Sequence, residues 1–261
     1  MKLYTKENLI KEFHKIAAQG WIENARKGNA GGVGNTLEDL LGIEENNLPI
    51  PNAAEWELKA QRLDTSSLTT LFHIEPSPRA VKFVPQILLL NYGWRHEEAG
   101  KKYSENEMSF RQTIHGNSAS DRGFIVKIDR INRKVLISFD YTKVSESHKD
   151  WLKSVKQRIG LDELNPQPYW GFDDLANKAG TKLLNCFYVQ AEVKKEAGKE
   201  FYHYNSVMML QKFSFDGFLQ ELENGNILVD FDARTGHNHG TKFRLRQNCF
   251  PNLYEKATVI L

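Results

Sequence analysis

The chain has 261 residues, of which 40% are hydrophobic and 11% aromatic, and its formal net charge at pH 7 is +2. This composition predicts a packed globular core and excludes a low-complexity disordered chain, and the length suffices for one large domain or two small ones. No apolar run approaches the roughly 20 residues that cross a bilayer, so we expect no membrane partner.

Neither the N-terminus nor the cysteines indicate export. Residues 1–8 lack the apolar stretch of a secretory signal. Cys186 and Cys249 are the only cysteines, and their wide separation argues against a disulfide framework and against a zinc site. We therefore expect a protein of a reducing cytoplasm.

The N-terminal part of the chain is predicted to form two helices separated by a loop. Apolar residues recur at helical spacing from Leu9 to Ala17, which predicts an amphipathic helix. The glycine-rich stretch 28–34 is typical of a loop. Thr36 is then expected to cap a short helix, because Asp39 stands where a capping box has Glu or Gln.

Residues 54–61 are predicted to form a strand with one polar and one apolar face, after a turn at 46–52 that holds two prolines and three asparagines. The polar face carries Glu55, Glu57 and Lys59, and the apolar face carries Trp56, Leu58 and Ala60. Because side chains two positions apart share a face of a strand, the three charged groups are expected to point together.

The rest of the chain mixes helices and strands. Strands are predicted over 124–128, 134–139, 184–191 and 227–231, and helices over 170–183 and 213–224. Asn132 and Arg133 are expected to connect the first two of these strands as a hairpin. The absence of regular βαβ alternation predicts an α/β or α+β core.

Three cations alternate near the C-terminus. Lys242, Arg244 and Arg246 stand at every second position, which on a strand places them on one face. Such a face suits a nucleic-acid partner, and an ordinary solvated strand face is the alternative.

The strand face with Glu55, Glu57 and Lys59 is the candidate site of chemistry. A hard cation such as Mg²⁺ takes oxygen ligands from one or two carboxylates together with substrate phosphate. The lysine can stabilise charge on the phosphoryl group or orient the attacking water. The pattern therefore indicates phosphodiester hydrolysis. The alternative is an exposed edge strand with an ordinary Glu–Lys face, because Glu-Leu-Lys is frequent by chance.

Longer motifs carry a resemblance to a known family. In chain order they are Gly34 to Leu41, Asn46 to Leu48, Pro51 to Lys59, Ser67 to Phe72, Gln112 to Asn117, Tyr169 to Asp173, Tyr202 to Ser206, Val229 to Arg234 and His237 to Arg244. In these motifs, which are spread in order over most of the chain, it resembles the MvaI/BcnI restriction endonuclease family, which is related to the mismatch-repair nickase MutH.

The resemblance implies a PD-(D/E)xK, MutH-like α/β fold with a central mixed sheet flanked by helices. Two lobes around a DNA cleft are expected, a catalytic lobe over about 1–125 and a DNA-recognition lobe over about 126–261. The implied activity is that of a type II restriction endonuclease of a restriction-modification system in the prokaryotic cytoplasm. It acts on double-stranded DNA as a monomer that nicks each strand in turn, with Mg²⁺ as cofactor and Mn²⁺ or Ca²⁺ as substitutes.

The family pattern places an Asp five residues before the Glu of the (D/E)xK strand. Glu57 and Lys59 match their positions, but Asn52 stands where the Asp is expected, and its neutral carbonyl binds Mg²⁺ more weakly. An isosteric knock-out, a naturally weak or lapsed nuclease, and compensation by Glu55 are the three explanations, so the implied metal set is Asn52, Glu55 and Glu57. Glu38 matches the family's helix glutamate and would support Lys59 or a metal-bound water; an acid in the first turn of a helix is the alternative.

The C-terminal motifs resemble the part of the family that enters the major groove. Asp232 and Arg234 are two residues apart and are expected to recognise the two halves of one G·C pair. His237, His239, Lys242 and Arg244 are further candidates for DNA contacts. For the two histidines, metal binding or solvation is the alternative.

Two histidines, one just after Leu71-Phe72 and one in the C-terminal loop, point to the subgroup. In BcnI-like members two histidines are thought to meet the central base pair, and His73 and His237 match them. A neutral imidazole can donate or accept, so the pair suits either orientation of a central C·G pair. The implied target is CCSGG (S is C or G) rather than CCWGG (W is A or T). A MutH-like nickase and an inactive sequence-specific DNA-binding protein are the rival functions, with a purely structural protein third.

Overall fold

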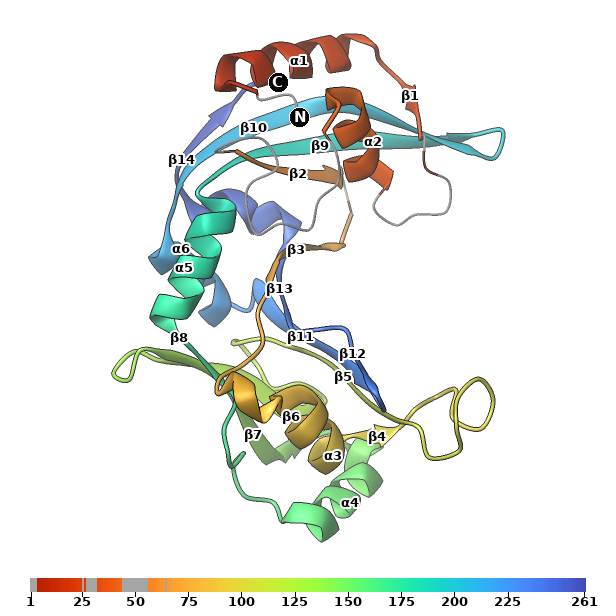
Figure 1. The fold of residues 1–261 in the computed structure, drawn as a ribbon, viewed down its shortest axis with the longest axis vertical. Coiled ribbons are helices and arrows are strands. Elements are labelled where there is room, and N and C mark those ends of the chain that lie inside the picture. The colour runs from red at the N-terminus through yellow and green to blue at the C-terminus, as the bar shows by residue number, and fades with distance from the viewer. Residues whose placement is uncertain (1–3, 25, 27–31, 44–55, 64) are drawn as a thin grey trace. The chain divides into compact units, whose positions relative to one another are not determined.

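The computed structural model describes residues 4–24, 26, 32–43, 56–63 and 65–261 (Figure 1). The predicted turn at 46–52, with Asn52, and the first predicted strand residues, Ala54 and Glu55, lie outside the described residues. The predicted mixture of helices and strands is confirmed. Within the described part of the chain, no helix combines the length and apolar character needed to span a membrane.

The chain forms two compact units, each assembled from separate stretches of sequence. The first unit comprises Met1–Thr69, Ala179–Phe215 and Phe250–Leu261, and the second comprises Thr70–Lys178 and Asp216–Cys249. The predicted boundary near residue 125 does not coincide with this division. The reason is that the strand with Glu57 pairs with a strand that begins at Asn185, so the first unit recruits residues from the C-terminal half.

A five-stranded sheet forms the centre of the first unit (Figure 1). Its order is β1 (Ile22–Glu23), β10 (Lys199–Phe213), β9 (Asn185–Glu196) and β2 (Glu57–Arg62), with β14 (Tyr254–Val259) also paired to β10. β2 runs parallel to β9, and the other pairs are antiparallel. β2 therefore ends the order of paired strands among the described residues.

Two helices share a core with this sheet. The predicted N-terminal helix is confirmed as α1 (Lys6–Ala18), which buries Leu9 and Phe13. The second is α2 (Gly32–Leu41). Apolar side chains of both helices pack in one cluster with those of β2, β9 and β10. The apolar face of β2 belongs to this cluster, so the predicted alternation of its side chains is confirmed.

The start of α2 differs from the prediction. The helix already includes Gly32 and Gly34, which were expected in a loop, and Thr36 is buried inside it rather than capping it. A Cβ at Gly32 would collide with the Tyr202 hydroxyl and with the Asn24 side chain. Close packing thus explains a glycine that the sequence pattern assigned to a loop.

The second unit contains two sheets (Figure 1). The six-stranded sheet has the order β3 (Leu68–His73), β13 (Lys242–Arg246), β11 (Ile227–Arg234), β5 (Met108–Ile114) and β4 (Trp94–Arg95), with β12 (His237–Asn238) paired to β11. The three-stranded sheet consists of β6 (Arg122–Asp129), β7 (Lys134–Val144) and β8 (Tyr169–Gly171).

Four α-helices complete the described elements. They are α3 (Leu89–Tyr92), α4 (Lys149–Ile159), α5 (Phe172–Leu183) and α6 (Phe215–Glu223), and short helical turns lie at Arg79–Val81, Val84–Leu88, Glu146–His148 and Gln247–Leu253. The predicted helix over 213–224 is confirmed as α6, and the predicted strands are confirmed as β6, β7, β9 and β11.

The predicted hairpin between β6 and β7 is confirmed, with Arg133 in the left-handed region (φ 53°). The helix predicted over 170–183 begins two residues later than expected. Trp170 lies in β8, opposite Val135 of β7, and its Nε1 donates a hydrogen bond to the carbonyl of Ile74. Strand pairing and this buried bond override the helical pattern there.

Candidate functional site

Glu57 begins β2 and is almost fully buried, with 1% of its side chain exposed. Lys59 follows on the same face, and its Nζ lies 2.8 Å from Oε1 of Glu57. The predicted meeting of these two groups is confirmed. A solvated edge strand is wrong for Glu57, because the side chain is enclosed although β2 ends the sheet order of the described residues.

The second carboxylate oxygen of Glu57 is the unusual atom of the site. Oε2 is buried and has no hydrogen-bond partner among the described residues. A buried, charged oxygen without a partner is costly, and a hard cation would satisfy it. The donor chemistry therefore fits Mg²⁺. No cluster of three or more His, Cys, Asp or Glu side chains suited to a metal occurs in the described ranges, and the other expected ligands, Asn52 and Glu55, lie outside them.

A second lysine reaches the same carboxylate. Lys182, in the last turn of α5, places its Nζ 3.4 Å from Oε1 of Glu57. The side chains of Lys59 and Lys182 are 18% and 22% exposed, so water screens both only in part. Two ammonium groups thus contact the same carboxylate oxygen, Oε1 of Glu57. Lys182 could not be predicted from the sequence, because nothing local to α5 indicates its contact with Glu57.

The neighbours of Glu57 on β9 and β14 are uncharged at neutral pH. Cys186 pairs with Glu57 in the parallel register, and burial raises the pKa of its thiol far above the ordinary value. Burial also raises the pKa of the Tyr254 hydroxyl, with further contributions from Cys186 and Glu57. A neutral, enclosed thiol is a poor nucleophile, so the lysines remain the charged partners of Glu57 in this surrounding.

Glu38 lies half-buried in α2, which packs against β2. Because α2 begins at Gly32, Glu38 is not in the first helical turn, and the alternative that rested on a first-turn acid is wrong. Its predicted role beside Lys59 stays a prediction.

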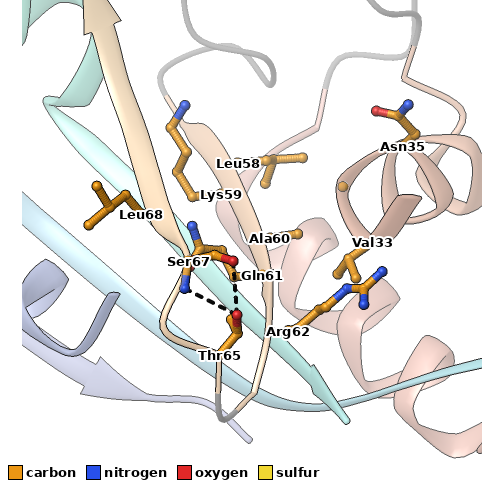
Figure 2. Close-up of a pocket in the computed structure, with 11 residues that line it drawn as sticks. Val33, Asn35, Leu58, Lys59, Ala60, Gln61, Arg62, Thr65, Ser67 and Leu68 are labelled. Carbon is orange, nitrogen blue, oxygen red and sulfur yellow. Dashed lines mark hydrogen bonds between the residues drawn. The ribbon is translucent and has the colours of Figure 1, made fainter. Parts of the chain in front are cut away.

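A pocket of about 340 Å³ runs along β2 next to Lys59 (Figure 2). Val33 and Asn35 of α2 line one side, and the segment after β2, with Thr65 and Ser67, lines another. The hydroxyl of Thr65 donates to Oγ of Ser67, and the backbone N–H of Ser67 donates back to Thr65 Oγ1 (2.9 and 3.1 Å). The pocket therefore gives access to Lys59 between walls that are about equally polar and apolar.

The predicted recognition residues lie in the second unit. They are Asp232 and Arg234 on β11, His237 on β12, His239 just after it, Lys242 and Arg244 on β13, and His73 at the end of β3. Asp232 and Arg234 point to the same side of β11, as their spacing predicts, but each has a different partner. Asp232 accepts from Nε of Arg111 on β5 (3.1 Å). Arg234 donates from Nη1 to Glu107 (3.0 Å), and its guanidinium lies 4.5 Å from the centre of the Tyr103 ring. Arg111 and Glu107 were not identified from the sequence.

The alternating cations near the C-terminus lie on β13, as predicted. Arg244 places Nη1 3.3 Å from Oδ2 of Asp230, and the Thr113 hydroxyl donates to Oδ1 of the same carboxylate (2.9 Å). Lys242 is the Cα partner of Asp230 across the β11–β13 ladder. Acids on β11 therefore offset part of the positive charge of β13.

The three predicted histidines are exposed, and two of them touch. The rings of His237 and His239 lie 4.2 Å apart in an edge arrangement. His73 is at the end of β3, where its Cδ2 lies 3.9 Å from the place a Cβ would take at Gly240. The amide and hydroxyl of Thr241 both donate to Glu75, which fixes this loop beside the end of β3. The structure thus brings His73 next to the loop that carries the histidine pair.

Comparison with known proteins shows which class this architecture represents. The sequence profile of the MvaI/BcnI restriction endonuclease family matches residues 10–254. A solved structure of the restriction endonuclease MvaI with its cognate DNA substrate is 28% identical and aligns over 99% of this chain and 100% of that chain, with a TM-score of 0.76. A structure of MvaI without DNA is also 28% identical, covers 100% of both chains and has a TM-score of 0.57. No curated protein matches in a sequence search.

The fold and its charged strand face thus define a restriction endonuclease. The chain belongs to the MvaI/BcnI restriction endonuclease family, because the match covers nearly its whole length. The resemblance drawn from the sequence motifs is confirmed. The roles of the individual site residues stay predictions.

Proposed function

We propose that the chain is a type II restriction endonuclease with a PD-(D/E)xK, MutH-like core that hydrolyses phosphodiester bonds of double-stranded DNA with Mg²⁺. The observation that carries the proposal is the buried carboxylate of Glu57, with Oε1 against Lys59 and Oε2 without a partner among the described residues. Family membership supports nuclease activity, and the donor chemistry of Glu57 supports a hard cation.

In the proposed site Glu57 holds Mg²⁺ together with Asn52 or Glu55, and Mn²⁺ or Ca²⁺ can take the same oxygen ligands. The bound metal supplies positive charge that activates water and stabilises the phosphoryl oxygens. Lys59 stands ready to donate a hydrogen bond to the scissile phosphate or to the attacking water. Lys182 contacts the same oxygen of Glu57 as Lys59 and adds a second positive charge beside it.

The proposed target is CCSGG, cut by a monomer that nicks one strand and then the other. The position of His73 beside the loop of His237 and His239 supports a shared contact with the central base pair. An odd-length target suits one asymmetric chain that binds in two orientations. The two cysteines are free and buried, in keeping with the proposed prokaryotic cytoplasm.

Digestion of plasmid DNA in Mg²⁺ with this chain and with its Asn52→Asp variant tests the proposal. Because the family pattern has an Asp at position 52 and Glu57 already faces two lysines, we expect poor cleavage by the chain itself and strong cleavage by the variant. Mapping the cut ends defines the target, and a preference for CCWGG would contradict the subgroup. Equal cleavage by both proteins would contradict the role of Asn52.

An inactive, sequence-specific DNA-binding protein is the second candidate, favoured by Asn52 and by the excess of lysine charge around Glu57. It predicts normal binding to the target without Mg²⁺-dependent cleavage, even at high protein concentration. A MutH-like nickase would instead leave nicked circles that never become linear. Binding that falls steeply with salt separates all of these from a purely structural protein.

A further inference from the structure

Arg111 on β5 stands directly opposite Asp232 on β11 in the antiparallel ladder. Its Nε and Nη2 lie 3.1 and 3.0 Å from the same carboxylate oxygen, Oδ1. The Arg111 side chain is nevertheless 69% exposed, whereas that of Asp232 is 22% exposed. The carboxylate therefore orients the arginine from its Nε side, while most of the arginine side chain remains accessible.

The environment of Arg234 is different. Its Nη1 donates to Glu107, whose side chain is 7% exposed, and its guanidinium stacks over Tyr103. Only 32% of the Arg234 side chain is exposed. The two arginines thus lie on neighbouring strands, β11 and β5, and Arg111 is the one that contacts Asp232.

We propose that Arg111 and Asp232 recognise one G·C pair together, as a preformed donor and acceptor. An arginine has five N–H donors, and the contacts to Oδ1 use the Nε side, so the outer edge of the guanidinium can donate to N7 and O6 of guanine. Both contacts go to Oδ1, and Oδ2 of Asp232 is the oxygen that we assign to the cytosine amino group. This inference rests on the proposed function and replaces the pairing of Asp232 with Arg234.

The energetics of the pair support a role outside folding. An ion pair with an arginine this exposed contributes little to stability, because water screens it and the long side chain loses freedom. In DNA recognition the same pair is useful, because the carboxylate holds the guanidinium in place before binding and less freedom is lost on contact. The neutral sum of the two charges also makes the contribution depend on base identity more than on phosphate attraction.

Equilibrium binding in Ca²⁺ without Mg²⁺ tests the proposal independently of cleavage. The probes are duplexes with CCCGG, with CCWGG, and with each single G·C pair of CCCGG replaced by A·T. Arg111→Ala should reduce discrimination at one G·C position by about 5- to 150-fold and leave the other positions unchanged. Arg111→Lys, which keeps the charge but loses the fork, should lose most of the same discrimination. Replacing the guanine at that position with 7-deazaguanine should weaken the unmodified protein and not Arg111→Ala.

Arg130→Ala is the matched control, because Arg130 forms another exposed ion pair in the second unit, with Glu223 at 2.9 Å. It should leave discrimination unchanged. The inference is overturned if Arg111→Ala weakens binding to every duplex by the same factor, which indicates a phosphate contact, or if it changes nothing. If the unmodified chain prefers none of the duplexes over unrelated DNA, the proposed function itself fails. If the unmodified chain prefers one of the duplexes but Arg111→Ala gives either of the results above, only the inference about Arg111 fails.

Discussion

Glu57 in the first unit and Asp232 in the second are both carboxylates that contact cationic side chains, but their surroundings differ. Glu57 is 1% exposed, contacts two lysines through one oxygen, and keeps a buried second oxygen without a partner among the described residues. Asp232 is 22% exposed and forms an ion pair with an arginine that is itself mostly exposed. The first site is electrostatically incomplete without a ligand, whereas the second is balanced.

These differences suit the two sites to different functions. A buried site with unbalanced charge is suited to binding a metal ion and a phosphate group, because charges interact strongly where water is excluded. An exposed, balanced pair contributes little to stability but offers directed donors and acceptors to a base edge. Substitutions should therefore abolish cleavage at the first site and alter sequence preference at the second.

The largest effect is expected for Lys59→Met in the Asn52→Asp background. Without the ammonium group beside Glu57, cleavage should fall by at least about 100-fold. The reason is that the site loses a hydrogen-bond donor that stabilises the negative charge on the phosphoryl group. Single-turnover digestion in Mg²⁺ measures this, and binding in Ca²⁺ should change far less. Lys15→Met, on the exposed face of α1, is the control. Cleavage within threefold of the parent would exclude the assigned role.

Glu107→Gln tests the buried partner of Arg234 in the second unit. The substitution removes a buried charge that holds Arg234, and the loss of a charge-assisted hydrogen bond should cost about 1.5–3 kcal/mol of unfolding free energy. Urea unfolding measures this cost. Glu105→Gln, which removes a highly exposed partner of Arg95, should cost less than about 0.5 kcal/mol. Similar losses for both variants would show that burial of Glu107 does not distinguish the two pairs.

Lys182→Met tests whether the first site carries an excess of positive charge. Removing an ammonium group 3.4 Å from Glu57 should strengthen cation binding, and solvent access to the side chain reduces the gain to about tenfold. We expect the Mg²⁺ concentration for half-maximal cleavage by the Asn52→Asp variant to fall accordingly. Lys178→Met, one turn earlier in α5, should leave it unchanged. A rise in the required Mg²⁺ would mean that Lys182 mainly orients Glu57.

The smallest effect concerns Asp121, which accepts a 2.7 Å contact from His148. Burial raises the pKa of Asp121, but hydrogen bonds from His148 and Gln112 and the charge of Arg122 outweigh it, so its pKa is below the ordinary value. A lowered folded pKa stabilises the protein above the unfolded pKa of about 3.9, and this stabilisation is lost as pH falls through the folded pKa.

Asp121→Asn should therefore destabilise the protein by less than about 1 kcal/mol at pH 7, and the difference from the parent should shrink toward pH 3. Urea unfolding across this pH range gives the profile. Asp174→Asn, at an exposed position 4.0 Å from Arg79, should show almost no pH-dependent difference. A difference that grows as the pH falls would contradict the assigned direction of the pKa.

Local patterns predicted local features well. The two faces of β2, the turn after β6 and the helix α6 follow from alternation, hairpin residues and helical spacing, all within a few neighbouring residues. Partners distant in the chain could not be predicted. Arg111 and Asp232 are 121 residues apart, and only the pairing of β5 with β11 makes them neighbours.

The start of α2 shows a different limit. Its glycines indicate a loop by propensity, yet Val33 and Leu37 bury their side chains in the core of the first unit and favour a helix there. The close approach of Tyr202 to Gly32 then requires the absence of a side chain. Tertiary packing outweighs a propensity difference of about 1 kcal/mol per glycine.

The interleaved construction of the two units has a consequence for biosynthesis. β14, which pairs with β10 and places Tyr254 near Glu57, follows β11 and β13 in the chain. A growing polypeptide therefore exposes the strands that carry Asp232 and Arg244 before the sheet around Glu57 receives its last strand. The order of synthesis thus delays completion of the proposed catalytic site until the strands with the proposed recognition residues have already been synthesised.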